Sequence, residues 1–148
     1  MNSSAFGFEK PEDNPGFLLW QTTITWQRLI YSELVKYDIS HAQFVLLALL
    51  LWHQEKKIKT TQNLMIKISK LDKMTVSKSL KKLELLSYVK REELETDTRF
   101  KSLKLTSKGK NLVSKIIPKI EKIDEDFFSC IKNNELKNLV GYLKKINI

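Results

Sequence analysis

Hydrophobic side chains recur at helical spacing along most of the chain, and this spacing is interrupted once, between residues 88 and 105. Apolar residues that return every three or four positions predict amphipathic helices. The pattern predicts helices over residues 17–36 and 41–53, after residue 60, after residue 72, over residues 107–131 and from about residue 134. The second of these is apolar nearly all round from Phe44 onward, so we expect it to be enclosed on most sides.

Several predicted helices begin at side chains that cap helix N-termini. Ser40 is followed three residues later by Gln43, which is the spacing of a capping box. Thr60, Asp72 and Thr106 are placed to accept hydrogen bonds from the first free N–H groups of the third, fourth and fifth helices. Two short helices joined by the tight turn "SKLD" are typical of a helix-turn-helix.

Residues 88–105 carry a different pattern. "YVKREEL" and "FKSLKL" show partial alternation of apolar and polar side chains, and the polar segment "ETDTR" lies between them. This arrangement predicts a β-hairpin, which directly after a helix-turn-helix is a wing. The predicted fold class is therefore mainly α (α+β), with a winged helix-turn-helix lobe.

The fourth helix, which contains "TVSKSLKKLE", has two unlike faces. Its apolar stripe consists of Val76, Leu80 and Leu83, and its opposite arc carries Lys78, Lys81 and Lys82. An ordinary solvated surface helix would show the same lysines, whereas a helix that lies against phosphate requires them. Features elsewhere in the chain are needed to distinguish between these two interpretations.

The distribution of charge favours an anionic partner. The chain has 148 residues, a formal net charge of +9 and a sequence pI near 9.6. Residues 60–110 hold thirteen basic and six acidic side chains, so most of the excess lies around the helix-turn-helix. Nucleic acid or an anionic membrane surface would be attracted to such a segment.

Length and compartment signals indicate one cytoplasmic domain. We expect residues 1–16, which are rich in Pro, Gly and Asn, to form an arm, and residues 17–148 to form a single domain. The longest apolar run, residues 44–52, is far shorter than the roughly 20 residues that span a bilayer, so no membrane contact is expected. Cys130 is the only cysteine, which fits a reducing compartment and a buried thiol.

Catalytic chemistry has little support. His41 and His53 are the only histidines, and with one cysteine they form no metal-ligand cluster. We interpret His41 as a first-turn residue and His53 as a helix-end residue. The acidic run 124–126 is interpreted as a solvated helix face, and no phosphate-binding loop is visible. We expect neither a cofactor, nor a metal, nor an enzyme activity.

The order of these elements resembles the MarR family of bacterial transcription regulators over roughly residues 17–146. "DISHAQFVLLALL" is similar to the second-helix entry of the family, and "TVSKSLKKLELLSYVKR" to its recognition helix and first wing strand. "DTRFKSLKLTSKGK" resembles the wing tip followed by Leu-Thr-x-x-Gly, here Leu105, Thr106 and Gly109. Members commonly have Gly in the helix-turn-helix turn and before the wing, where this chain has Ser69 or Lys70 and Ser87. A left-handed residue there would carry modest strain.

The resemblance implies a homodimer that binds double-stranded DNA at a palindromic site as a repressor or activator. Residues 17–39 and 107–148 would form the dimerisation helices, and residues 40–106 the winged lobe. The implied dimer contacts on the last helix are Leu136, Leu139, Leu143 and Ile146.

The implied DNA contacts divide by role. Base edges would be reached from the start of the recognition helix, phosphates from the third helix, the recognition helix and the wing strands, and the minor groove by Arg99, oriented by Asp97. The full set is Thr61, Gln62, Lys73, Met74, Thr75, Ser77, Lys78, Lys81, Lys82, Arg91, Asp97, Arg99 and Lys101. For each lysine, plain solvation is the alternative.

The family often binds small aromatic effectors between its two lobes. The candidate lining residues here are Trp20, Trp26, Phe44 and Trp52, although aromatic residues at helical spacing are more often core. The alternative function is an interaction module that keeps the winged fold and uses it for a protein or RNA partner. Salt-dependent binding to a defined duplex would separate the two.

Overall fold

A computed structural model describes residues 4–94 and 97–147, and for residues 93–94 and 97–100 the description covers the backbone only. The mainly helical fold with a two-stranded sheet is confirmed. In chain order the elements are η1 Pro11–Asp13, α1 Pro15–Leu34, η2 Val35–Tyr37, α2 His41–Glu55, α3 Gln62–Ser69, α4 Lys73–Leu85, β1 Val89–Leu94, β2 Asp97–Leu105, α5 Ser107–Phe127 and α6 Asn133–Ile146.

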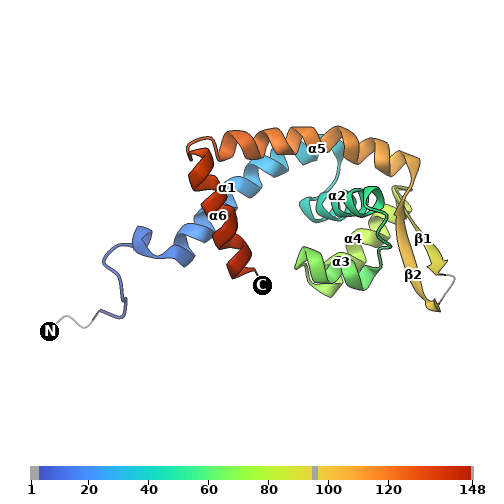
Figure 1. The fold of residues 1–148 in the computed structure, drawn as a ribbon, viewed down its shortest axis with the longest axis horizontal. Helices are drawn as coiled ribbons and strands as arrows, with labels where there is room; N and C mark the ends of the chain where they lie inside the picture. Colours follow the sequence, from blue (N-terminus) through green and yellow to red (C-terminus); the bar gives the residue numbers. More distant parts are fainter. Residues whose placement is uncertain (1–3, 95–96, 148) are drawn as a thin grey trace.

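The long helix α5 connects two groups of elements (Figure 1). At one end it joins the hairpin β1–β2, with α2, α3 and α4 below it. At the other end it turns into α6, which lines one cavity together with α1, and residues 4–14 project away from the start of α1. The molecule is therefore elongated, with a winged lobe and a helical lobe held together by α5.

Helix α2 forms the centre of the core, as its nearly continuous apolar sequence predicted. Leu46 and Leu47 are fully buried, and α2 packs against α4, α5 and β2. Helix α5 contributes the buried residues Val113 and Ile116, and α1 contributes Ile30. Burial of apolar surface of this kind supplies about 25 cal/mol per Å² and is the main stabilising contribution in such a domain.

Most of the predicted helix starts are confirmed, and one is wrong by a residue. Ser40 and Gln43 form the capping box of α2, and Thr106 caps α5. The N-cap of α3 is Thr61, whose hydroxyl accepts from the N–H of Leu64 at 3.2 Å. Thr60, which the sequence suggested as the cap, is buried instead. Two adjacent threonines can both cap a helix, and only packing distinguishes them.

The hairpin is longer than the sequence predicted. Strand β2 begins at Asp97, so residues 97–99 belong to a strand and not to the expected turn, and residues 95–96 lie outside the described residues. Val89 pairs with Leu105 in an antiparallel register, and both side chains are buried on the inner face. Leu103 N–H donates to Thr60 O at 2.7 Å, and an isolated antiparallel bridge between Thr61 and Ser102 attaches the α2–α3 link to β2.

The C-terminal end of α5 and the environment of the cysteine differ from expectation. The helix ends at Phe127 rather than near residue 131, and the hydroxyl of Ser129 donates to the carbonyl oxygen of Asp126 at 2.6 Å. Such a local bond competes with helix continuation. Cys130 therefore falls in the α5–α6 turn and is exposed, which corrects the prediction of a buried thiol. Pro118 lies inside the helix, as its sequence position implied.

Among the described residues, no single helix is long and apolar enough to cross a bilayer. The segment Pro15–Tyr37 and helix α2 together have the length and apolar composition of a span, but they are bent by 80° at the break between them.

Candidate nucleic-acid interface

Helix α4 separates its apolar and cationic faces as the sequence predicted. Val76, Leu80 and Leu83 are fully buried against the winged lobe. The outward face carries the exposed residues Lys73, Met74, Ser77, Lys78, Lys81 and Lys82. None of these four lysines forms an ion pair with a carboxylate whose side chain the structure describes. The positive charge of this face is therefore available to an external anion.

The start of α4 is fixed by its cap. Asp72 accepts from the N–H of Thr75 at 2.8 Å and from the Thr75 hydroxyl at 2.6 Å. These hydrogen bonds hold the pKa of Asp72 below its ordinary value, and the ionised carboxylate suits the positive end of the helix dipole. The Thr75 hydroxyl donates its proton to Asp72. The hydroxyl oxygen and the methyl group of Thr75 are therefore the parts of this side chain that can contact a base.

Two left-handed residues set the angles around α4. Lys70, between α3 and α4, has φ 60°, and Ser87, between α4 and β1, has φ 62°. These are positions where the sequence predicted strain in the absence of glycine. The turn of the helix-turn-helix and the entry to the wing thus have a left-handed backbone, although neither position is glycine, the residue that adopts this conformation most easily.

Arg91 links three elements of the winged lobe. Its Nε donates to Glu84 Oε1 at 3.0 Å on α4, and its Nη2 donates to Gln62 Oε1 at 3.0 Å on α3. Arg91 and Gln62 were both predicted to contact phosphate, and the structure joins them to each other. Glu84 was not predicted, because a lone glutamate seven residues before an arginine carries no recognisable signal. This network orients α3 and α4 relative to the wing.

The outer face of the wing carries a charge cluster. Glu92 pairs with Lys90 at 3.0 Å and with Lys104 at 2.7 Å, and these hydrogen bonds hold the pKa of Glu92 below its ordinary value. Lys101 is exposed. Asp97 and Arg99 lie in β2, and their side chains lie outside the described part of the structure, so their predicted DNA contacts remain predictions.

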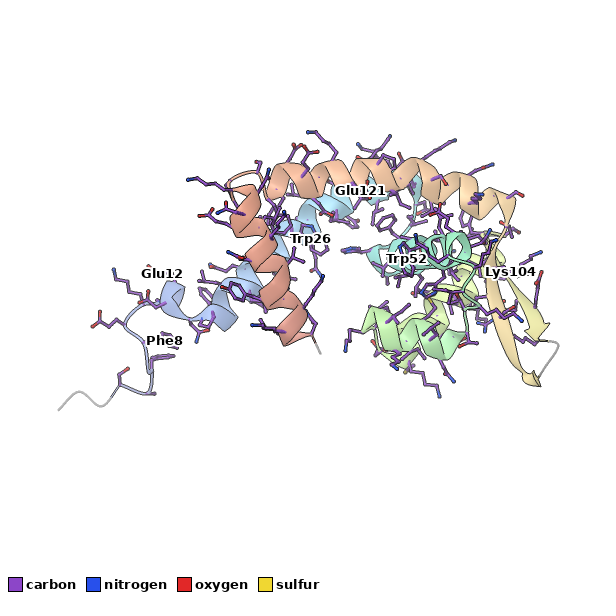
Figure 2. All side chains as sticks on the ribbon, viewed as in Figure 1. Phe8, Glu12, Trp26, Trp52, Lys104 and Glu121 are labelled. Carbon is purple, nitrogen blue, oxygen red and sulfur yellow. The ribbon has the colours of Figure 1, made fainter. Side chains whose placement is uncertain are left out.

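The four aromatic residues that were predicted to line one ligand pocket lie in different parts of the structure. Phe44 and Trp52 line a groove of about 540 Å³ between α2 and α5. Trp26 lines a cavity of about 720 Å³ among α1, α5 and α6, and Trp20, 61% exposed on α1, lines neither. Figure 2 shows Trp26 and Trp52 on different helices beneath α5.

The junction between the two lobes is held by polar contacts. The indole Nε1 of Trp26 on α1 donates to Asp124 Oδ1 on α5 at 2.7 Å. The centroid of the Trp26 ring lies 5.1 Å from the centroid of the His41 ring, and His41 begins α2 as predicted. Burial lowers the pKa of His41, while the nearby charge of Asp124 opposes that shift. These three residues connect α1, α2 and α5.

The other histidine is a structural residue. His53 is buried in the third position from the end of α2, and its Nδ1 is hydrogen-bonded to the hydroxyl of Thr60 at 2.9 Å. Within the described ranges, no group of three His, Cys, Asp or Glu side chains could hold a metal ion.

The last helix presents much of its apolar surface to solvent. No side chain of α6 is buried; Leu136, Leu139 and Leu143 are half-buried, and Ile146 is 72% exposed. Helix α1 exposes further large apolar side chains, including Leu19 and Tyr31. An apolar surface shared by two terminal helices is typical of a face that another protein surface covers.

Comparison with known proteins identifies the family. Residues 35–124 match the ArnR1-like, winged-helix domain family. The chain is 36% identical over 139 residues to the HTH-type transcriptional regulator YdcH of Bacillus subtilis (strain 168), covering 93% of this chain and 95% of that protein.

Solved structures show the same fold. The Staphylococcus aureus MepR–DNA complex is 25% identical with a TM-score of 0.80, covering 90% of this chain and 96% of MepR. Wild-type MarR from E. coli is 22% identical with a TM-score of 0.70 and the same coverage. The chain belongs to the ArnR1-like winged-helix family of helix-turn-helix transcription regulators, and it has the fold of the MarR structure.

Proposed function

We propose that this regulator binds a palindromic DNA operator as a homodimer and that a small ligand bound between its lobes alters its affinity for DNA. Residues 40–106 form the DNA-binding lobe in this proposal, and residues 17–39 and 107–148 form the dimerisation helices. The observation that carries it is the cationic outer face of α4, which lies opposite a fully buried stripe.

The arrangement of α4 suits a major groove. Lys73, Met74 and Lys78 lie near the start of the helix, where side chains reach base edges, and lysine can donate to guanine while Met74 can contact a thymine methyl. Lys81 and Lys82 lie further along the same exposed face and suit phosphates. The network of Arg91 holds this helix at a fixed angle to the wing, as a duplex contacted at two places requires.

The terminal helices support a dimer. Leu139 and Leu143 line the cavity of about 720 Å³ together with Leu18 and Leu19 of α1. Side chains of a second copy could fill this cavity and cover the exposed apolar residues of α6. A two-fold symmetric pair would then place two α4 helices on successive major grooves of one palindrome.

The relatives give independent support. The MepR structure is a complex with DNA, and the Bacillus subtilis protein is named as a transcriptional regulator. The two matches cover 90% and 93% of this chain.

Selection of duplexes from a random pool, followed by fluorescence anisotropy on the selected sequence, tests the proposal. We expect an inverted-repeat sequence, binding that resists excess unrelated duplex, and a dimer by sedimentation. Binding that is equally strong to every duplex, to RNA only, or to no nucleic acid would instead support the interaction-module alternative. A monomeric protein in the DNA complex would contradict the homodimer.

A further inference from the structure

The groove of about 540 Å³ between α2 and α5 has an apolar floor and an aromatic wall. Phe44 is buried in it, Ile117 is half-buried, and Trp52 is 52% exposed along its α2 side. Figure 2 shows Trp52 on α2 and Glu121 on α5, the helix that passes above it. An organic molecule with an apolar body would fit a groove of this size and lining.

The polar groups of the groove are all negative or neutral. Glu55, Glu121 and Asp124 line it, and no Lys, Arg or His with a described side chain does, although the whole chain carries a net charge of +9. Neither Glu55 nor Glu121 forms an ion pair with another side chain in the described parts of the chain. Asp124 is anchored by the Trp26 indole, which leaves its charge in place. The groove therefore concentrates negative charge on an otherwise basic protein.

A main-chain acceptor adds to this polarity. Proline has no N–H, so Pro118 cannot donate the helical hydrogen bond to the carbonyl oxygen of Ser114, four residues earlier. Both residues line the groove. The carbonyl oxygen of Ser114 thus receives no i to i−4 backbone hydrogen bond and keeps its partial negative charge.

We propose that the groove binds an organic cation with an aromatic or aliphatic body, such as a quaternary ammonium compound or a protonated amine. The cationic head would lie among the carboxylates of Glu55 and Glu121 and over the face of Trp52, where cation–π attraction operates. The apolar body would cover Phe44 and Ile117. An aromatic carboxylate of similar size is repelled by the same charges, so the sign of the ligand's charge decides binding.

The position of the groove makes its occupant a regulator. Helix α2 belongs to the winged lobe, and α5 carries the dimerisation end, so a ligand that contacts both favours one separation of the lobes. This step rests on the proposed function, since it matters only if lobe separation controls DNA affinity. Binding of the cation itself does not require DNA and is measured without it.

Isothermal titration calorimetry of the full chain at low ionic strength tests the charge preference directly. The probes are benzyltrimethylammonium, phenylacetate and benzyl alcohol, which share a benzyl body and differ in charge. We expect benzyltrimethylammonium to bind at least roughly tenfold more tightly than either of the others, because only it gains Coulomb attraction. Equal affinity for the three probes, tighter binding of phenylacetate, or no binding of the cation would overturn the proposal.

Variants assign the binding to this groove. The double substitution Glu55→Gln with Glu121→Gln removes two exposed charges and should weaken the cation by roughly tenfold. Glu125→Gln, which removes an exposed charge of α5 outside the groove, should leave the affinity unchanged. Wild-type affinity in the double variant would overturn the assignment. A protein that binds the cation but no DNA would contradict the proposed function alone, and one that binds DNA but not the cation would contradict this inference alone.

Discussion

Gly109, in the first turn of α5, lies against the backbone of Tyr88, so closely that a β-carbon at residue 109 would stand 2.9 Å from the Tyr88 carbonyl carbon and would overlap its oxygen. Thr106 completes this junction, because its hydroxyl donates to Ser87 O at 2.6 Å and accepts from Gly109 N–H at 3.0 Å. The Leu-Thr-x-x-Gly segment therefore fixes the base of the wing to the start of α5.

Substitution of this glycine should be costly. We expect Gly109→Ala to destabilise the protein by about 1–3 kcal/mol, because the added methyl group must displace backbone atoms rather than a flexible side chain. Gly141→Ala is the matched control: a β-carbon there meets nothing within 4 Å, and alanine should stabilise α6 by about 0.5–1 kcal/mol. Urea unfolding of both variants measures the difference, and a neutral Gly109→Ala would show that the close approach is not tight.

Glycine at position 87 should make the protein more stable than serine does. Its φ of 62° is strained for a side chain, so we expect Ser87→Gly to stabilise the protein by up to about 1 kcal/mol, with the gain reduced by the added freedom of the unfolded chain. The bond from Thr106 uses the backbone oxygen of Ser87 and survives the change. Ser87→Ala serves as the control, with little gain expected in thermal unfolding. Equal unfolding temperatures for the Gly and Ala variants would contradict the strain.

The two adjacent threonines before α3 should differ in their effects. Thr60→Val leaves the buried His53 Nδ1 without its partner and should cost about 1–3 kcal/mol. Thr61→Ala removes only the N-cap of α3 and should cost about 1 kcal/mol. Chemical denaturation of the two variants compares them. A larger loss for Thr61→Ala than for Thr60→Val would reverse the structural assignment.

Glu33 should give stability a pH dependence. It is buried on α1, pairs with Lys36 at 2.6 Å and with Lys119 of α5 at 3.7 Å, and its pKa lies below the ordinary 4.5 chiefly through the Lys36 hydrogen bond. A carboxyl with a lowered folded-state pKa stabilises the protein above the unfolded pKa and loses that contribution as pH falls through the folded one.

The variant Glu33→Gln isolates this contribution. We expect it to be less stable than wild type by about 1 kcal/mol at pH 7, since the lysines that hold the charge are largely exposed. The difference should shrink as the pH is lowered below 4.5. Guanidinium unfolding across that range measures it, and a difference that stays constant would exclude the charge as its source.

The sequence predicted the elements well where the signal was local. Hydrophobic spacing located α2, α4 and the hairpin, and cap residues located three helix starts, because each depends on a few neighbouring residues. Hydrophobic spacing placed the C-terminal end of α5 too late, because Ile131 continues the apolar period. The Ser129 hydroxyl, which donates to the carbonyl oxygen of Asp126, helps to end the helix before that residue. Thr60 and Thr61 were indistinguishable because the burial of Thr60 depends on His53 and the wing.

The candidate site was predicted unevenly for a similar reason. The exposed lysines of α4 followed from their position opposite the apolar stripe. The link between Arg91, Gln62 and Glu84 spans three elements, and no local pattern shows it. The carboxylates of Glu55 and Glu121 come from separate helices and line one groove only because α2 packs against α5.

The salt dependence of DNA binding tests the role of α4 most directly. Replacing Lys81 and Lys82 with Ala should weaken binding to all duplexes similarly and flatten the slope of log K against log salt concentration by roughly two units per protomer, because each lysine at a phosphate releases about one counterion. Lys110→Ala with Lys115→Ala, which removes two exposed charges of α5, is the matched control and should leave the slope unchanged. A wild-type slope in the Lys81 and Lys82 variant would contradict the assignment of α4 as the DNA-binding surface.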